Sequence, residues 1–320
     1  MKWKKLKRIF NPSDHLLPFG CIDYAQSPQA LVFDDYIRIY FSTRSRDTFN
    51  KYLSHIVYLD IDKNFNSIVR ISKDIVIKLG NRGCFDEHGI FPMNVVRNYG
   101  KVYAFTCGWN RKVSVSVDTA IGLAVSDNDG VSFLKVGDGP VISSSLNEPF
   151  LVGDPFVFVV NKLFHMWYIF GVSWKTYVSG TPPDRIYRIG HAVSSDGINW
   201  IKDSRQIIDE KFPDESQALP TVIDINGIYH MFFCYRQSSD FRNNRERSYR
   251  IGYAYSYDML HWVRNDELVG IDTTPGSWDS DMLCYPHVFR CDDKVYLLYN
   301  GNEFGRFGFG IAFLENDHGS

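Results

Sequence analysis

Residues 220–235 read PTVIDINGIYHMFFCY, and this stretch contains the pattern that decides the fold. Pro220 opens a short apolar run, the polar pair Asn226-Gly227 follows, and a second apolar run continues to Tyr235. Two apolar runs joined by a tight polar turn are typical of a β-hairpin. A proline is tolerated best where a strand begins. The stretch therefore predicts two antiparallel strands.

The same proline-led pattern occurs five times along the chain. The prolines are Pro28, Pro92, Pro155, Pro220 and Pro286, with spacings of 64, 63, 65 and 66 residues. Repeats of this length account for all 320 residues. Internal repeats of a fixed period indicate stacked or radial architectures. We therefore expect one domain that spans residues 1–320.

A third apolar segment follows each of three hairpins as Gly-x-Ala-x-Ser, at residues 122–126, 190–194 and 252–256, and a short fourth segment comes after it. Four antiparallel strands per repeat are the pattern of a propeller blade. The last repeat stops after its third strand, near Phe313. The predicted fold class is all-β, a five-bladed β-propeller with four antiparallel strands per blade. In it, the N-terminal strand near residues 6–10 closes the last blade.

Composition limits the class of partner. Charged residues make up 22% of the chain and the formal net charge is −2, without the basic excess of nucleic-acid-binding proteins. No apolar run approaches the roughly 20 residues of a membrane span, and no export signal follows the basic N-terminus. The six cysteines form no CxxC pair. We expect a cytoplasmic protein with free thiols, no nucleic-acid or membrane partner, and no metal or other cofactor.

In a propeller, the starts of the first strands and the ends of the second strands meet at one mouth. Several carboxylates fall there, and four of them are the catalytic candidates: Asp86, Glu87, Asp154 and Glu215. Clustered carboxylates raise one another's pKa, and glycoside hydrolysis uses such a pair. Glu215 is the first choice as general acid, with Asp154 as base or orienting group. The alternative is that Glu215 only pairs with an arginine such as Arg236.

Further polar and aromatic side chains at the same mouth are candidates for substrate binding, because arginines and amides hold hydroxyl, carboxylate or phosphate groups and ring faces stack on sugars. They are Gln26, Arg44, His88, Trp109, Arg236, Asp281, His287 and Asn302. Additional arginines at 185, 188, 242, 245, 247 and 250 either lie in solvated loops or bind an anionic substrate.

Several of these segments resemble a known superfamily. The segments YHMFFCYR (229–236) and YLLYNGN (296–302) and the turn DGINW (196–200) are similar to those of the five-bladed propeller glycosidases, glycoside hydrolase families 32, 43, 68 and 130. The resemblance covers essentially the full chain. It implies a carbohydrate substrate, with hydrolases, transglycosidases and phosphorylases all represented.

The chain departs from parts of the family pattern. Families 32 and 43 place an acidic base or nucleophile in the first blade, where this chain has Gln26-Ser27-Pro28, and Asp154 stands where family 43 has a glutamate. The family 130 phosphorylases use one aspartic acid, with arginine and histidine binding phosphate. The resemblance makes Arg44, Arg236 and His287 candidates for that role.

Three functions follow as alternatives. The first is a glycoside hydrolase-like enzyme that cleaves a small or acidic glycan or sugar conjugate by carboxylate acid–base catalysis. The second is a glycoside phosphorylase or glycosyl-transferring enzyme that uses a sugar phosphate or nucleotide sugar. The third is a non-catalytic glycan-binding propeller. Dependence of turnover on phosphate separates the first two, and binding without turnover indicates the third.

Overall fold

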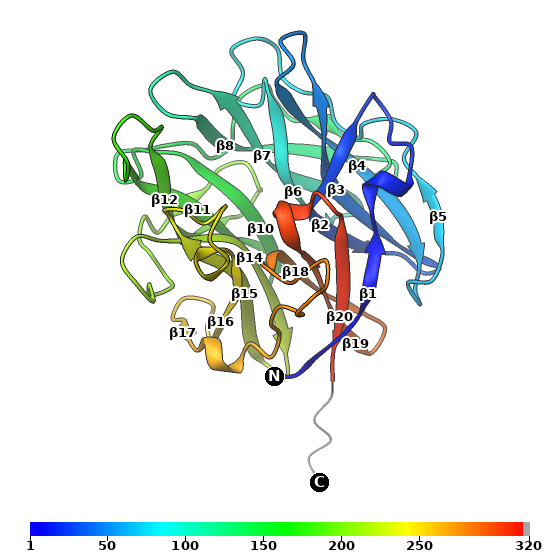
Figure 1. Ribbon diagram of the computed structural model, residues 1–320. Helices are drawn as coiled ribbons and strands as arrows, with labels where there is room; N and C mark the ends of the chain where they lie inside the picture. Colours follow the sequence, from blue (N-terminus) through cyan, green and yellow to red (C-terminus); the bar gives the residue numbers. More distant parts are fainter. Residues whose placement is uncertain (316–320) are drawn as a thin grey trace.

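The computed structural model describes residues 1–315, and its regular secondary structure consists almost entirely of antiparallel strands (Figure 1). The strands are β1 (Trp3–Phe10), β2 (Ile22–Val32), β3 (Tyr36–Arg46), β4 (Tyr52–Asp62), β5 (Ile68–Ile71), β6 (Gly89–Asn98), β7 (Lys101–Arg111), β8 (Val117–Ser126), β9 (Leu134–Lys135), β10 (Val152–Val160), β11 (Leu163–Lys175), β12 (Asp184–Ser194), β13 (Ile201–Lys202), β14 (Glu215–Ile225), β15 (Ile228–Gln237), β16 (Arg250–Ser256), β17 (Val263–Arg264), β18 (Cys284–Cys291), β19 (Lys294–Asn300) and β20 (Phe309–Leu314). The helical segments are short: η1 (Pro12–Asp14), η2 (Arg245–Arg247), η3 (Asp266–Leu268) and α1 (Asn302–Gly305). None of the helices in the described chain is long and apolar enough to cross a membrane.

The strands form four hydrogen-bonded sheets. Two of them, β10 to β13 and β14 to β17, follow the order of the chain, and a third has the order β1-β20-β19-β18. The fourth sheet contains β2 to β9, and its two halves are joined by the single pair Ser54 and Gly89 of β4 and β6. Within each repeat the first and second strands pair as the sequence predicts.

The hairpin of β14 and β15 follows from its turn residues. Ile225 pairs with Ile228 across Asn226 and Gly227, whose φ angles are 55° and 80°. A two-residue turn with positive φ at both positions matches the twist of the flanking strands, and asparagine followed by glycine is the preferred pair for it. The turn thereby sets the register of the hairpin.

The two ends of the chain lie side by side. β1 pairs with β20 from Trp3 opposite Leu314 to Phe10 opposite Phe309, which Figure 1 shows as the blue strand beside the red one. Trp3 and Phe10 are buried, and Trp3 packs edge-on against Phe232 of the preceding repeat. The N-terminal strand therefore contributes to the core as well as to the sheet.

Every first strand has an irregularity at the residue before its proline. The pairing register shifts there in β2, β6, β10, β14 and β18. The φ angle is 52° at Ser27, 48° at Asp154, 48° at Leu219 and 56° at Tyr285, and the Phe91-Pro92 bond is cis. Left-handed backbone at a non-glycine residue is rare and strained. Such bulges redirect the side chain of the affected residue.

Apolar side chains fill the space between neighbouring sheets, where Phe105 of one repeat makes edge-on contacts with Phe164 and Trp200 of the next. All six cysteines are free, as expected from the sequence.

Candidate functional site

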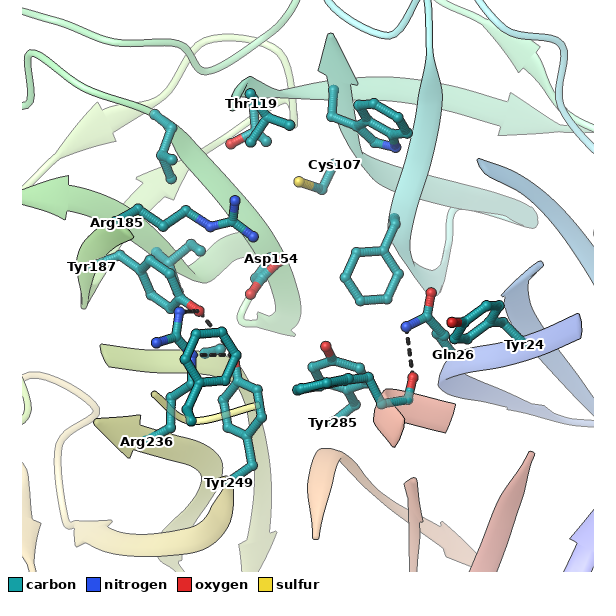
Figure 2. Close-up of a pocket in the computed structure, with 18 of the residues that line it drawn as sticks. Tyr24, Gln26, Cys107, Thr119, Asp154, Arg185, Tyr187, Arg236, Tyr249 and Tyr285 are labelled. Atoms are coloured by element: carbon teal, nitrogen blue, oxygen red, sulfur yellow. Dashed lines mark hydrogen bonds between the residues drawn. The ribbon is translucent and has the colours of Figure 1, made fainter. Parts of the chain in front are cut away.

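A pocket of about 330 Å³ lies where all five first strands begin (Figure 2). Each of these strands contributes at least one lining residue, among them Gln26, Phe91, Asp154, Ala218 and Tyr285. The other lining residues are Tyr24, Arg44, Cys107, Trp109, Val117, Thr119, Leu151, Ile169, Arg185, Tyr187, Arg236, Phe241, Arg242, Tyr249 and Phe304. We call this space the central pocket.

Asp154 is the one carboxylate among the residues that line the central pocket. Its backbone bulge turns the side chain inward, and Figure 2 shows it between Arg185 and Tyr285. The side chain is buried, and its Oδ2 accepts a hydrogen bond of 3.3 Å from the backbone N–H of Leu219, the bulge residue of the next repeat. The bulge at Asp154 thus turns the carboxyl group into the pocket, and the bulge at Leu219 supplies the hydrogen bond that fixes it.

Burial raises the pKa of Asp154 to about 7, although the Leu219 N–H and the charge of Arg185 act in the opposite direction. A carboxyl group in a desolvated site keeps its proton because the charged form loses its hydration. A general acid works best when its pKa lies near the working pH. Asp154 is therefore suited to give up and take back a proton near neutrality.

The central pocket also contains four arginines, Arg44, Arg185, Arg236 and Arg242, and none of them forms an ion pair with a carboxylate of residues 1–315. Elsewhere in the chain, enclosed arginines have such partners. Arg38 binds Asp60 at 2.8 Å, Arg188 binds Glu210 at 2.7 Å and Arg264 binds Glu215 at 2.7 Å. The central pocket thus has an excess of positive charge that favours a negatively charged ligand.

Three of these arginines form a cluster. Repulsion by Arg236 and Arg185 adds to burial in lowering the pKa of Arg242. Arg236 is 2% exposed and lies 3.6 Å from the ring centre of Phe241. A cation over an aromatic face gains about 2 kcal/mol when desolvated, whereas burying an ion costs several kcal/mol. The rings offset part of the cost, and the charge itself remains available to an anion.

Arg236 also organises two tyrosines. Its Nε donates to Tyr249 and its Nη2 to Tyr187, at 3.2 and 3.1 Å, and the two hydroxyl groups are 2.8 Å apart. Only one of the two hydroxyl protons is used between the tyrosines. Because arginine offers donors only, the second hydroxyl proton remains free to be donated to a ligand.

Arg44 lies on the other side of the pocket, in a neutral setting. Its Nε and Nη2 donate to Oε1 of Gln26 at 3.1 and 2.6 Å, and its Nη1 donates to Ser54. Ser54 also accepts from the indole of Trp109 at 3.0 Å. A Cβ at Gly89 would lie 2.3 Å from that indole nitrogen, so glycine is required for Trp109 to occupy this position.

Aromatic rings form a continuous wall beside the carboxyl group. Tyr285 packs edge-on against Phe91 and Tyr249, with ring centres 5.3 and 5.7 Å apart, and Tyr249 contacts Phe304 at 6.1 Å. Flat apolar faces of this kind stack on the C–H faces of sugars. The pocket therefore combines a proton donor, cations and a stacking surface.

Five of the twelve predicted site residues line the central pocket: Gln26, Arg44, Trp109, Asp154 and Arg236. Glu215, the first choice as general acid, does not. It is fully buried, and it accepts hydrogen bonds from Arg264 at 2.7 Å, Gln217 at 3.0 Å and the Lys211 N–H at 2.9 Å. The Glu215 carboxylate thus connects β14 to β17 and serves a structural role. The predicted alternative of an ion pair is met, with Arg264 in place of Arg236.

The second-repeat candidates also lie outside the central pocket. Asp86 is buried and ion-paired with Lys135 of β9. Glu87 accepts from the Gly83 N–H at 2.8 Å, and His88 stacks on Trp109 with ring centres 5.9 Å apart. Burial first, and then the charge of Arg111, lowers the pKa of His88. The expected cluster of carboxylates on one axis is therefore not formed.

The fifth-repeat candidates occupy two other places. Asp281 and Asn302 line a smaller pocket of about 220 Å³ that shares Phe241, Arg242 and Phe304 with the central one. Asn302 accepts from the Asp281 N–H at 2.8 Å. His287 lines a separate cavity of about 410 Å³, and burial lowers its pKa to about 3, so it is neutral.

Sequence reasoning missed the tyrosines and Cys107. Tyr285 precedes its proline as Asp154 does, and that shared position was a usable signal. Tyr187 lies in the first part of β12 and Tyr249 directly precedes β16, whereas the predicted mouth contained only first-strand starts and second-strand ends. Within residues 1–315 no group of three or more His, Cys, Asp or Glu side chains is arranged to hold a metal ion.

Comparison with known proteins identifies relatives over the full length. The chain is 35% identical over 322 residues to the uncharacterized protein Rv1502 of Mycobacterium tuberculosis (strain ATCC 25618 / H37Rv), which covers 99% of this chain and 100% of the relative. The uncharacterized protein MT1551 of strain CDC 1551 / Oshkosh matches with the same identity and coverage. A 1,2-beta-oligomannan phosphorylase of Thermoanaerobacter sp. (strain X514) is 32% identical over 81 residues, 25% of this chain and 26% of that enzyme. No protein-family model matches the chain.

Solved structures share the fold at low identity. A thermostable family-43 glycoside hydrolase matches with a TM-score of 0.64 at 14% identity, over 95% of this chain and 93% of that one. A structure from a study of the family of mannoside phosphorylases GH130, which contains glycoside hydrolases that target beta-1,2 mannosidic linkages in Candida mannan, matches with a TM-score of 0.67 at 13% identity, over 99% and 95%. The chain therefore belongs to the same family as the two Mycobacterium tuberculosis proteins and has the β-propeller fold of the glycoside hydrolases of families 43, 32 and 130.

Proposed function

We propose that this protein is a carbohydrate-active enzyme that transfers a glycosyl unit between a sugar hydroxyl and phosphate, with Asp154 as its general acid and base. The observation that carries the proposal is the pairing of one protonatable carboxyl group with unpaired arginines in one pocket. The proposal takes the sheets as five blades of a single domain. It counts the sheet of β2 to β9 as two blades, because one residue pair joins its halves.

The single acidic side chain in the lining of the central pocket supports transfer to phosphate over hydrolysis. Hydrolysis by paired carboxylates needs a second acidic side chain that activates water or attacks the sugar. Among the described residues that line the central pocket, Asp154 has no such partner. Phosphate needs no activating base, since its oxygens are already anionic at neutral pH.

In the direction of cleavage, a phosphate oxygen attacks the anomeric carbon while the bond from that carbon to the leaving oxygen breaks. Asp154 gives its proton to the leaving oxygen, so the products are a glycosyl phosphate and a free sugar hydroxyl. In the reverse direction, the Asp154 carboxylate takes the proton of the acceptor hydroxyl and phosphate departs. Positioned proton transfer of this kind contributes about 10²–10⁴-fold to the rate.

The cluster of Arg185, Arg236 and Arg242 is the proposed phosphate site. Guanidinium groups match phosphate oxygens with paired N–H donors. The free hydroxyl proton of the Tyr187 and Tyr249 pair supplies one more neutral donor beside Arg236. Phosphate bound there would relieve the mutual repulsion of the three cations.

The test is turnover of oligosaccharides with and without inorganic phosphate, followed by detection of glycosyl phosphate. Synthesis from a panel of hexose and hexuronic acid 1-phosphates with sugar acceptors tests the reverse reaction. We expect product only when phosphate or a glycosyl phosphate is present. Equal turnover in phosphate-free buffer would indicate a hydrolase, and sugar binding without turnover in either direction would indicate a binding protein.

A further inference from the structure

The central pocket contains a second cationic site, separate from the three-arginine cluster. Arg44 comes from β3, whereas Arg185, Arg236 and Arg242 come from β12, β15 and the loop after β15. In Figure 2, Gln26, which holds Arg44, lies on the opposite side of Asp154 from Arg185 and Arg236. Repulsion from Arg236 and Arg185 adds to burial in lowering the pKa of Arg242, whereas burial lowers the pKa of Arg44 and no other arginine contributes to it.

The neighbours of Arg44 hold it in place without neutralising it. Gln26 takes two of its N–H groups through one oxygen, and Ser54 takes a third. Gln26 is fixed in turn, since its Nε2 donates to the Phe304 carbonyl at 2.6 Å. A guanidinium group has five N–H donors, so one remains on each terminal nitrogen. The rings of Tyr24 and Phe91 lie 5.9 and 5.7 Å from it.

A charged group with two remaining donors fits an anion with two acceptor oxygens and a single charge. A carboxylate has that form and binds arginine through parallel hydrogen bonds. A phosphate dianion carries more charge than one guanidinium group offsets, and the three-arginine cluster suits it better. Arg44 is therefore matched to a carboxylate on the ligand.

We propose that the glycosyl unit bound in the central pocket is a uronic acid, whose carboxylate Arg44 recognises. This inference rests on the proposed function for the presence of a sugar, and it adds the class of that sugar. Arg44 is then a specificity-determining residue, while Asp154 and the three-arginine cluster act on the bond that breaks and on phosphate. The Trp109 ring, held by the same Ser54, lies beside the sugar site.

The test measures equilibrium binding by calorimetry, independent of turnover. The ligands are glucuronate, galacturonate and mannuronate, each compared with the matching neutral hexose, with inorganic phosphate titrated separately. The wild-type protein should bind at least one uronate about tenfold or more tighter than its neutral counterpart. Arg44→Gln should abolish this preference and leave phosphate affinity unchanged, which also shows that the variant is folded. Arg44→Lys keeps the charge and should retain part of the preference.

Arg46→Gln is the matched control, because Arg46 lies two residues along the same strand, is exposed and is absent from the pocket lining. It should keep the wild-type preference. Absence of any uronate preference in the wild-type protein, or its persistence in Arg44→Gln, would overturn the inference. Uronate preference together with turnover that ignores phosphate would preserve the inference and reject the proposed function.

Discussion

The carboxyl group of Asp154 accepts a hydrogen bond from the backbone N–H of Leu219, 65 positions later in the chain and at the equivalent place in the next repeat. Both residues have left-handed φ angles, and neither conformation is one that a residue before proline adopts readily. The strained backbone of one repeat thus orients the acid presented by another. Tertiary packing must maintain both bulges for the proton donor to stay in place.

Replacing Asp154 by asparagine removes the proton and preserves the shape. We expect turnover to fall about 10²–10⁴-fold, with little change in KM, since sugar contacts and the arginines remain. Steady-state kinetics with an unactivated oligosaccharide checks this. Asp127→Asn, at an exposed carboxylate paired with Lys101, is the control and should behave as the wild type. Near-normal turnover in Asp154→Asn would remove this residue from the mechanism.

The two directions of the reaction should have opposite pH limbs. Cleavage needs the protonated carboxyl group, so kcat/KM should decline as pH rises through about 7, the pKa of Asp154. Synthesis from a glycosyl phosphate needs the carboxylate, so its kcat/KM should rise through the same region. Initial rates in both directions between pH 5 and 9 provide the measurement. Profiles that move together with pH would show that another group limits both.

Asp154 should also make stability depend on pH. Its pKa is raised from 3.8 in the unfolded chain to about 7 in the folded protein, so the folded state binds the proton more tightly. Its favourable contribution is complete below pH 3.8 and is lost as pH rises to about 7. At about 1.4 kcal/mol for each pKa unit, the loss is roughly 4 kcal/mol. Melting temperatures of the wild type and Asp154→Asn should therefore diverge between pH 4 and 8, with the variant relatively more stable at the upper end.

Glu215 gives the contrasting result. Glu215→Gln breaks the buried ion pair with Arg264 but touches nothing in the central pocket. Arg264 keeps a second ion pair, with Asp266 at 2.9 Å, so the cost should be smaller than the about 3–5 kcal/mol of a buried charge left without any partner. Thermal unfolding should occur several degrees lower, while turnover below the unfolding temperature stays within a few-fold of the wild type. Loss of turnover with unchanged stability would restore Glu215 as a catalytic candidate.

Deleting residues 1–10 removes β1 and leaves the edge of β20 unpaired. The buried Trp3 and Phe10 would also be lost. Burial of each large apolar side chain contributes about 1.5–3 kcal/mol, so we expect a lower melting temperature and, because an open strand edge pairs with other chains, aggregation. Differential scanning calorimetry and light scattering test both effects. An unchanged melting temperature would show that β1 contributes nothing to the stability of the last sheet.

The hairpins could be predicted because their information is local. A proline, a polar turn and two apolar runs lie within about 16 residues, and pairs such as Asn226-Gly227 specify the turn type. The predicted starts and ends of the strands also located the mouth, and Arg44, Arg236 and Asp154, which were placed there, do line one pocket.

The direction of individual side chains could not be predicted in the same way. A shift of one residue in register turns a side chain to the other face of a strand. The bulges introduce such shifts, and Glu215 and Asp154 differ in their position relative to the bulge of their strand. Glu215 lies four residues before the bulge residue Leu219, whereas Asp154 is itself the bulge residue. The first packs between strands and the second faces the pocket. The exact number of residues between a carboxylate and the proline of its strand therefore decides whether its side chain faces the pocket.

The repeated bulges separate the chemistry of this protein from the architecture that supports it. Each repeat offers one position ahead of its proline, and three of the five side chains there, Phe91, Asp154 and Tyr285, reach the pocket. None of these three is needed to form the hairpin turn at the far end of its strand. A change of a single residue at such a position can therefore exchange a stacking ring, a proton donor or a hydroxyl while the hairpins stay as they are. The scaffold therefore tolerates exchange of the pocket residues one at a time, which is a physical route by which one fold accommodates several reactions on sugars.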